Sequence, residues 1–150
     1  MAHTFTQLYY HIVFSTKNRH PWITDDLAVR LHPYLGGAIR DQGGAALCVN
    51  GMPDHIHILA RLRQDKALSD MMRDLKANSS GWVHREMPGL RDFAWQGGYA
   101  AFTVSTSQKE RVSQYIAKQR EHHRLLSYRD ELLALLKAHE MEFDENYFLD

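Results

Sequence analysis

Residues 51–62 read Gly-Met-Pro-Asp-His-Ile-His-Ile-Leu-Ala-Arg-Leu and join a turn to an alternating strand. An apolar run precedes this turn, so the sequence predicts a short antiparallel hairpin with strands at 45–51 and 55–62. Residues two apart on a strand share a face, so His55 and His57 project together and the isoleucines beside them point the other way. The isoleucine face should meet a helix-covered core, which places both imidazoles on the free, exposed face of the sheet.

Strand and helix patterns on both sides of this hairpin alternate regularly. Thr24 is a suitable N-cap for a helix whose leucines repeat every four residues. Ser107 and Glu110 form a capping-box pattern, and Ser127 with Asp130 repeats the serine–acid spacing. The expected strands are 6–15, 45–51, 55–62 and 99–106, and the expected helices are one from Thr24 to the Gly43-Gly44 pair, then 68–86, 108–123 and one from about Ser127.

The order β-α-β-β-α-β followed by two helices predicts an α+β, ferredoxin-like (RRM-like) fold. We expect a four-stranded antiparallel sheet with two helices on one face, and C-terminal helices of which one bears Tyr115. The other face would be bare unless an added helix covers it. The chain is interpreted as a single domain, 1–150, with a core at 5–123 and a C-terminal helix and tail at 124–150. The acidic and aromatic residues 141–150 are expected to pack loosely or not at all.

Composition excludes several classes of protein. Of the 150 residues, 44% are hydrophobic and 24% are charged, which is typical of a folded globular domain. Lys+Arg and Asp+Glu are both 18, and this balance counts against a non-specific nucleic-acid coat protein but allows a local basic patch. The single cysteine, Cys48, allows no internal disulfide. No signal-peptide pattern and no membrane-length apolar run occur, so we expect a cytoplasmic protein that makes no contact with membranes.

Two small constellations could support chemistry. His55 and His57 could chelate one ion, although two ordinary surface histidines would give the same pattern. Tyr115 and Gln119, four apart on a predicted helix, would present a hydroxyl and an amide side by side. Taken alone, Tyr115 is better explained as a half-buried aromatic of an amphipathic helix. The adjacent pair His122-His123 diverges by about 100° on a helix and is assigned to the helix end, where cationic side chains are favoured.

The two constellations complement each other in phosphodiester chemistry. A tyrosine oxygen can form a covalent phospho-enzyme, and a divalent cation can neutralise the charge that develops on the phosphate. Two neutral imidazoles and one amide oxygen would form a cation site with no protein anion. Such a site should bind metal weakly until a DNA phosphate supplies negative oxygens.

The sequence also resembles the single-tyrosine HUH transposases (TnpA) of small bacterial insertion sequences. The matching segments run through nearly the whole chain: Tyr-His-Ile-Val-Phe-Ser-Thr-Lys at 10–17, Met-Pro-Asp-His-Ile-His-Ile-Leu at 52–59, Leu75-Lys76 with Ser79-Ser80, Trp95-Gln96 through Gly98-Tyr-Ala-Ala-Phe-Thr-Val-Ser105, and Val112-Ser-Gln-Tyr-Ile-Ala-Lys-Gln-Arg-Glu-His-His123. The resemblance departs at Ala100, where the family more often has glycine.

The resemblance implies a role for each matched residue. His55 and His57 would be the HUH metal ligands, Gln119 the amide ligand and Tyr115 the nucleophile. Tyrosine attack on single-stranded DNA would leave a 5′-phosphotyrosine and a free 3′-hydroxyl that later rejoins strands, with Mg²⁺ or Mn²⁺ as cofactor. The family also implies a homodimer in which one chain can lend its tyrosine helix to the other, hairpins at element ends as DNA partners, and a bacterial or archaeal cytoplasm.

Two alternatives remain open. A domesticated HUH nuclease acting on chromosomal repeats, or another HUH enzyme such as a replication initiator or relaxase, would share this chemistry. A non-catalytic ferredoxin-like nucleic-acid-binding module would instead stack bases on aromatic side chains of the open sheet, where this sequence offers His55, His57 and Arg61. Candidate phosphate contacts in either case are Lys17, Arg19, Arg73 and Lys76.

Overall fold

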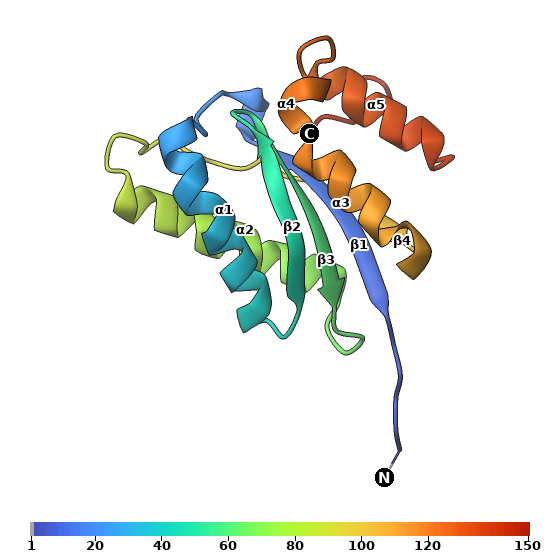
Figure 1. Cartoon of the computed structure of the whole chain (residues 1–150). Coiled ribbons are helices and arrows are strands. Elements are labelled where there is room, and N and C mark those ends of the chain that lie inside the picture. The colour runs from blue at the N-terminus through green and yellow to red at the C-terminus, as the bar shows by residue number, and fades with distance from the viewer. Residues whose placement is uncertain (1) are drawn as a thin grey trace.

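A four-stranded antiparallel sheet lies at the centre of the computed structural model, which describes residues 2–150 (Figure 1). Its strands are β1 (Leu8–Ser15), β2 (Ala45–Met52), β3 (His55–Leu62) and β4 (Ala100–Val104), in the spatial order β2-β3-β1-β4. β3 pairs with β1 so that His55 lies opposite Ser15 and His57 opposite Val13. The α+β, ferredoxin-like prediction is confirmed, although β4 is shorter at both ends than expected.

Two helices cover one face of this sheet, α1 (Asp25–Asp41) and α2 (Leu68–Glu86). Four apolar side chains of α1, each four residues from the next, are completely buried: Leu27, Leu31, Leu35 and Ile39. They join Ile56 and Ile58 of β3 and the apolar stripe of α2 in the main core. Both helices were predicted correctly because their periodic apolar positions face a large contiguous surface.

Three further helices cover the second face, α3 (Lys109–Ala117), α4 (Gln119–His122) and α5 (Tyr128–Ala138) (Figure 1). Ile116 of α3 packs on Leu59 of β3 and Tyr9 of β1. The apolar side of α5 packs on Val13 and Phe102 through Tyr128, Leu132 and Leu136. The face that carries the two histidines is therefore enclosed.

The prediction of one continuous helix over 108–123 is wrong, because the chain breaks at Lys118 (φ −100°, ψ 27°) between α3 and α4. Asn50 of β2 donates its side-chain N–H groups to the carbonyls of Ile116, at 3.0 Å, and Ala117, at 3.3 Å. These bonds satisfy carbonyls that a helix end leaves free, so α3 can end here.

Of the three predicted N-caps, only Ser127 makes a side-chain cap bond; Thr24 stands at the N-cap position of α1 without one, and Ser107 does not cap α3. Ser127 accepts the backbone N–H of Asp130 at 3.1 Å, as expected at the start of α5. Ser107 instead lies in a 3-10 turn, η2 (Thr106–Gln108), and its hydroxyl pairs with that of Ser105. Another 3-10 turn, η1 (Lys17–Arg19), follows β1.

The expectation that the tail packs loosely is also wrong. Phe143, Phe148 and Leu149 pack against the cluster formed by β1, β4 and α5. The Asp150 carbonyl accepts the backbone N–H of Gly98 at 3.0 Å and the Gln96 amide at 2.9 Å. The last residues therefore belong to the folded unit. Within residues 2–150, no helix is long and apolar enough to cross a membrane.

The hairpin that presents the histidines depends on Gly51. A methyl group on Gly51 would collide with the backbone carbonyl of His55, whereas one on Gly89 would meet open space. We expect Gly51→Ala to lower the free energy of unfolding by about 1–3 kcal/mol, as overpacking against backbone does. Gly89→Ala is the matched control and should change it by less than about 0.5 kcal/mol. Urea unfolding of both variants measures the difference, and equal midpoints would contradict the close approach.

Candidate metal and nucleophile site

His55 and His57 lie side by side on β3, opposite the core face that carries Ile56 and Ile58. They share one face of the strand, as their spacing predicts. Their predicted exposure is wrong, since both residues are fully buried. Helices α4 and α5, which follow the β-α-β-β-α-β core, pass over this face and enclose the rings.

The carboxylate of Glu131, on α5, lies at the centre of the enclosed site. Its Oε1 atom lies 2.8 Å from His57 Nε2, 3.0 Å from His123 Nε2 and 3.4 Å from His55 Nε2. Its Oε2 atom accepts the Tyr115 hydroxyl. One buried carboxylate thus contacts three imidazoles with one oxygen and the phenol with the other.

Gln119 completes this arrangement from α4. Its Nε2 donates to Glu131 Oε2 at 3.2 Å, and its Oε1 lies 3.2 Å from His55 Nε2 and 3.1 Å from His123 Nε2. The structure therefore brings Tyr115 and Gln119 to the histidine pair, although the two residues belong to separate helices.

Each histidine of the β3 pair is held from behind. His55 Nδ1 lies 2.7 Å from Asp54 Oδ1, and His57 Nδ1 lies 2.8 Å from His11 Nε2. A partner on Nδ1 fixes the orientation of an imidazole and leaves Nε2 directed at the site. This is the arrangement that metal-binding histidines usually have.

The electrostatics of the site favour an ionised carboxylate and a neutral phenol. Burial opposes the charged form of Glu131, but hydrogen bonds with His123, His55 and His57 outweigh it and hold the pKa of Glu131 well below its usual range. Burial also opposes the charged form of His55, yet Asp54 and then Glu131 raise the pKa of His55 to about 9. Burial lowers the pKa of His57.

The Tyr115 phenol is protonated in this arrangement. Burial, followed by the hydrogen bond and the negative charge of Glu131, raises the pKa of Tyr115 above its ordinary value. A tyrosine oxygen in this environment needs a nearby positive charge before it can act as an anion.

Four side chains could together hold a metal ion: His55, His57, His123 and Glu131. Their donor atoms all lie within 4.8 Å of one another. Three imidazoles and a carboxylate are ligand types that divalent cations accept in proteins. The chemistry of the donor set therefore fits a metal centre.

Comparison with known proteins places this chain in a family. Residues 4–119 match the family described as IS200-like transposases. The chain belongs to the IS200-like transposase family. Membership implies DNA strand transfer as the general activity, and the family match ends at Gln119, before His123 and Glu131.

Individual relatives of this transposase are recognisable in sequence and structure. The ISDra2 transposase TnpA of Deinococcus radiodurans is 28% identical over 120 residues, which cover 77% of this chain and 86% of the relative. A crystal structure of a Deinococcus radiodurans protein described as a transposase superposes with a TM-score of 0.66 at 26% identity, over 79% of this chain and 95% of that one. A REP-associated tyrosine transposase bound to a REP hairpin has the same fold, with a TM-score of 0.60 at 17% identity over 82% of this chain and 73% of that one.

Sequence reasoning missed Glu131 and His11, and it did not foresee that His123 faces the site. The prediction of a site with no protein anion is wrong because Glu131 occupies its centre. His123 stands at the C-terminal end of α4, as predicted, but its ring also faces the site, whereas His122 diverges from it, as their spacing predicts, and stacks on Tyr115. One signal for Glu131 was available, since an acidic residue stands at an apolar position of the α5 stripe.

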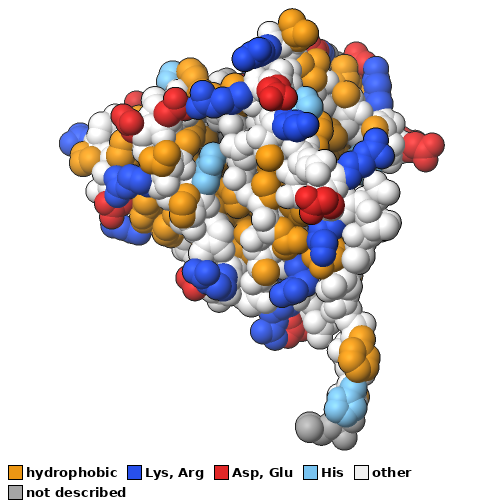
Figure 2. Space-filling view, viewed as in Figure 1, with side chains coloured by type: hydrophobic (Ala, Val, Ile, Leu, Met, Phe, Trp, Pro, Cys, Tyr) orange, Lys and Arg blue, Asp and Glu red, His pale blue; other side chains and the backbone are white. Residues whose placement is uncertain are grey.

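The four candidate phosphate contacts stay predictions. Arg73 and Lys76 are on α2, across the sheet from the histidines. Arg73 pairs with two acidic residues of its own helix, and Lys76 donates to backbone carbonyls of residues 96–98. Lys17 is exposed in η1, and Arg19 donates to the Leu149 carbonyl at 3.4 Å. Figure 2 shows Lys and Arg side chains scattered among Asp and Glu over the viewed face.

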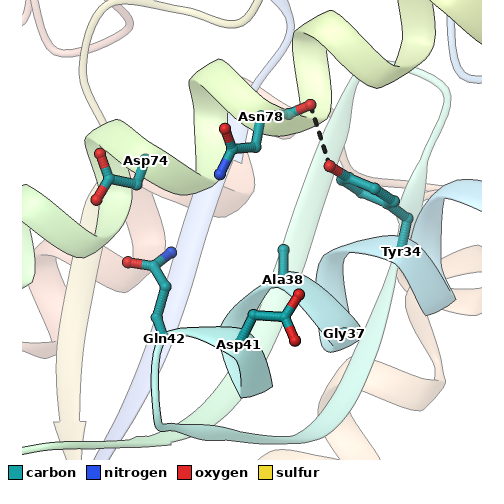
Figure 3. Close-up of a pocket in the computed structure, with 7 residues that line it drawn as sticks. All are labelled: Tyr34, Gly37, Ala38, Asp41, Gln42, Asp74 and Asn78. Carbon is teal, nitrogen blue, oxygen red and sulfur yellow. Dashed lines mark hydrogen bonds between the residues drawn. The ribbon is translucent and has the colours of Figure 1, made fainter.

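Two hollows differ in their suitability for DNA. One of about 380 Å³ lies between α1 and α2, where Tyr34 donates to the Asn78 carbonyl at 3.2 Å (Figure 3). Asp41 and Asp74 line it and would repel a phosphate. The other, of about 720 Å³, opens between β4, α3 and α5, and its lining includes Tyr115 and Arg111. Only the second hollow reaches the candidate site.

Because His57 is buried and bonded, its removal should affect the fold as well as any metal. His57→Ala would leave Glu131 and His11 each without one buried partner. We expect metal-free His57→Ala to lose about 1–3 kcal/mol of stability. This corresponds to a fall of about 2–4 °C in Tm per kcal/mol.

Differential scanning calorimetry in a chelator measures this change. His3→Ala is the control, because His3 is exposed. A His57→Ala midpoint equal to that of His3→Ala would contradict the buried contacts of His57.

Proposed function

We propose that this transposase cleaves and rejoins single-stranded DNA with Tyr115 as the nucleophile and a divalent cation at His55, His57 and Gln119. The observation that carries the proposal is the convergence of the Tyr115 hydroxyl and two strand-held imidazoles on one carboxylate. A nucleophile and a cation site separated by one carboxylate are close enough for a single phosphate to reach both. Family membership supports strand transfer as the outcome.

The cleavage step is a transesterification. The Tyr115 oxygen forms a bond to phosphorus and gives up its proton, the bond from phosphorus to the 3′-oxygen breaks, and the departing 3′-oxygen takes up a proton. The DNA then carries a free 3′-hydroxyl on one fragment and a 5′-phosphotyrosine on the other. Rejoining is the reverse attack by a 3′-hydroxyl, so the bond energy is conserved and no external energy source is required.

The chain's own residues would position the reactants. His55, His57 and Gln119 would hold Mg²⁺ or Mn²⁺, which when bound supplies positive charge beside the phosphate. Asp54 and His11 orient the two imidazoles from behind. Arg111, at the hollow that opens beside Tyr115, is suitably charged to meet the strand as it approaches.

The DNA partner is proposed to be a strand that folds into hairpins at element ends. A structural neighbour with the same fold is described as bound to a REP hairpin, which supports this class of partner. A domesticated nuclease acting on chromosomal repeats would use the same residues on a different hairpin. A module without catalysis would not require a tyrosine and a carboxylate buried together beside two histidines.

Replacing Tyr115 tests the nucleophile directly. Tyr115→Phe keeps the ring and removes the attacking oxygen, so DNA binding should remain and the covalent adduct should disappear. Tyr128→Phe is the matched control, since the Tyr128 ring lies 4.5 Å from that of His55 yet its hydroxyl has no partner in residues 2–150. Denaturing gels with 5′- and 3′-labelled single strands report the adduct. A protein–DNA band that persists in Tyr115→Phe would refute the assignment.

A mixing experiment tests whether two chains share a site. The family resemblance predicts a homodimer with exchanged tyrosine helices, but here Tyr115 reaches Glu131 and His57 of its own chain. We therefore propose a self-contained site and expect no cleavage from His57→Ala mixed with Tyr115→Phe. Subunit exchange is verified first by native mass spectrometry. Recovery toward about a quarter of wild-type activity would instead establish sharing, because half the dimers would each have one intact site.

A further inference from the structure

Three imidazoles present Nε2 atoms to one carboxylate oxygen, Glu131 Oε1, and two of them also face Gln119 Oε1, a pattern that hydrogen bonds alone explain poorly. His123 Nδ1 must donate to the Leu126 carbonyl, 2.6 Å away, because a carbonyl only accepts. Its Nε2 is then a lone pair in the neutral ring, yet it faces Glu131 Oε1 at 3.0 Å and Gln119 Oε1 at 3.1 Å. The interaction between a lone pair and two acceptor oxygens is repulsive unless a proton or a cation lies between them.

The same problem recurs at the β3 histidines. Asp54 engages His55 Nδ1, and His55 Nε2 also faces Glu131 Oε1 and Gln119 Oε1. His57 Nε2 lies against the same carboxylate oxygen. Protons on all three Nε2 atoms would make His55 and His123 buried cations beside one carboxylate, whereas His57 could donate from Nε2 as a neutral ring whose Nδ1 accepts from His11. One divalent ion satisfies all three lone pairs and the carboxylate at once.

The spacing of the donors also fits an ion. Ligands arranged tetrahedrally at about 2.0–2.1 Å from Zn²⁺ lie about 3.3–3.4 Å from one another. Glu131 Oε1 lies 2.8, 3.0 and 3.4 Å from the three nitrogens, close to that spacing, and all four donor atoms lie within 4.8 Å of one another. All four side chains are at most 6% exposed, which excludes most water ligands.

We propose that His123 and Glu131, from the C-terminal segment, complete a four-ligand site with His55 and His57 that holds a transition-metal ion of the Zn²⁺ or Co²⁺ type without DNA. This inference deepens the proposed function, because it adds two protein ligands beyond the family-matched residues 4–119. Imidazole-rich donor sets favour borderline transition metals over Mg²⁺, which prefers oxygen ligands and retains several waters. The carboxylate supplies the negative charge that a DNA phosphate would otherwise have to bring.

Cobalt absorption tests the site with no DNA present. The full chain is stripped with a chelator and titrated with Co²⁺, whose visible absorption is strong in tetrahedral sites and weak in octahedral ones. We expect saturation at one equivalent with a tetrahedral spectrum that a large excess of Mg²⁺ does not remove. A weak octahedral spectrum in the wild-type protein would overturn the proposal without depending on any variant.

Variants then identify the ligands. Glu131→Gln and His123→Asn should each weaken Co²⁺ binding at least tenfold, and His57→Ala should abolish it. The controls are Glu142→Gln and His3→Asn, which alter exposed residues and should leave the titration unchanged. Circular dichroism at the titration temperature shows which variants are folded. If Glu131→Gln or His123→Asn is unfolded, the remaining one of the two tests the ligand assignment.

The outcomes separate this inference from the proposed function. Co²⁺ binding that depends on His57 but is unchanged in both C-terminal variants would overturn the inference and leave Tyr115-dependent cleavage intact. The reverse outcome is a protein that binds Co²⁺ tetrahedrally through Glu131 and His123 but forms no Tyr115 adduct with DNA. That result would overturn the proposed function and leave this inference intact.

Discussion

The buried carboxylate of Glu131 is the contact on which the arrangement of the second sheet face depends. An ionised carboxylate removed from water costs several kcal/mol unless charged or hydrogen-bonding partners compensate it. Here the partners come from β3, α3 and α4, and the carboxylate itself comes from α5. Because none of these elements can leave without exposing an uncompensated group, the site and the packing of the C-terminal helices are stabilised together.

The alternation of β3 separates the core from the candidate site within a single strand. Ile56 and Ile58 join the core beneath α1 and α2, and His55 and His57 lie on the other face. A shift of one residue in register would exchange these faces, burying imidazoles in the core and directing isoleucines at Glu131. The tight turn at Gly51, where the backbone of His55 leaves no room for a side chain, helps to hold this register.

Local patterns made most of the first 86 residues predictable. The apolar repeats of α1 and α2 and the alternation of β3 arise wherever helices pack on one face of a sheet, so periodicity alone located these three elements. Chemical complementarity and the family resemblance, in contrast, led to the prediction that His55, His57, Tyr115 and Gln119 form one site; the structure brings them together, while their catalytic roles stay predictions. The predictions that failed concern features that depend on contacts between residues far apart in the sequence. The break at Lys118 depends on Asn50, 66 residues from the carbonyl that it binds, and the tail is held by Gly98.

Glu131 combines both kinds of information. Its place in the apolar stripe of α5 is a local signal that an acid will be buried, but its three histidine partners come from two other parts of the chain.

The two oxygens of Glu131 lie where a reacting phosphate would have to lie, one toward the imidazoles and the other on the Tyr115 hydroxyl. Two anions cannot share that space, since their repulsion is strong in a buried site. If Tyr115 is the nucleophile, DNA must therefore displace Glu131, and α5 has to move relative to β3 before the phosphate reaches the tyrosine. The helix that supplies a ligand of the proposed DNA-free site would therefore also determine when DNA can enter it.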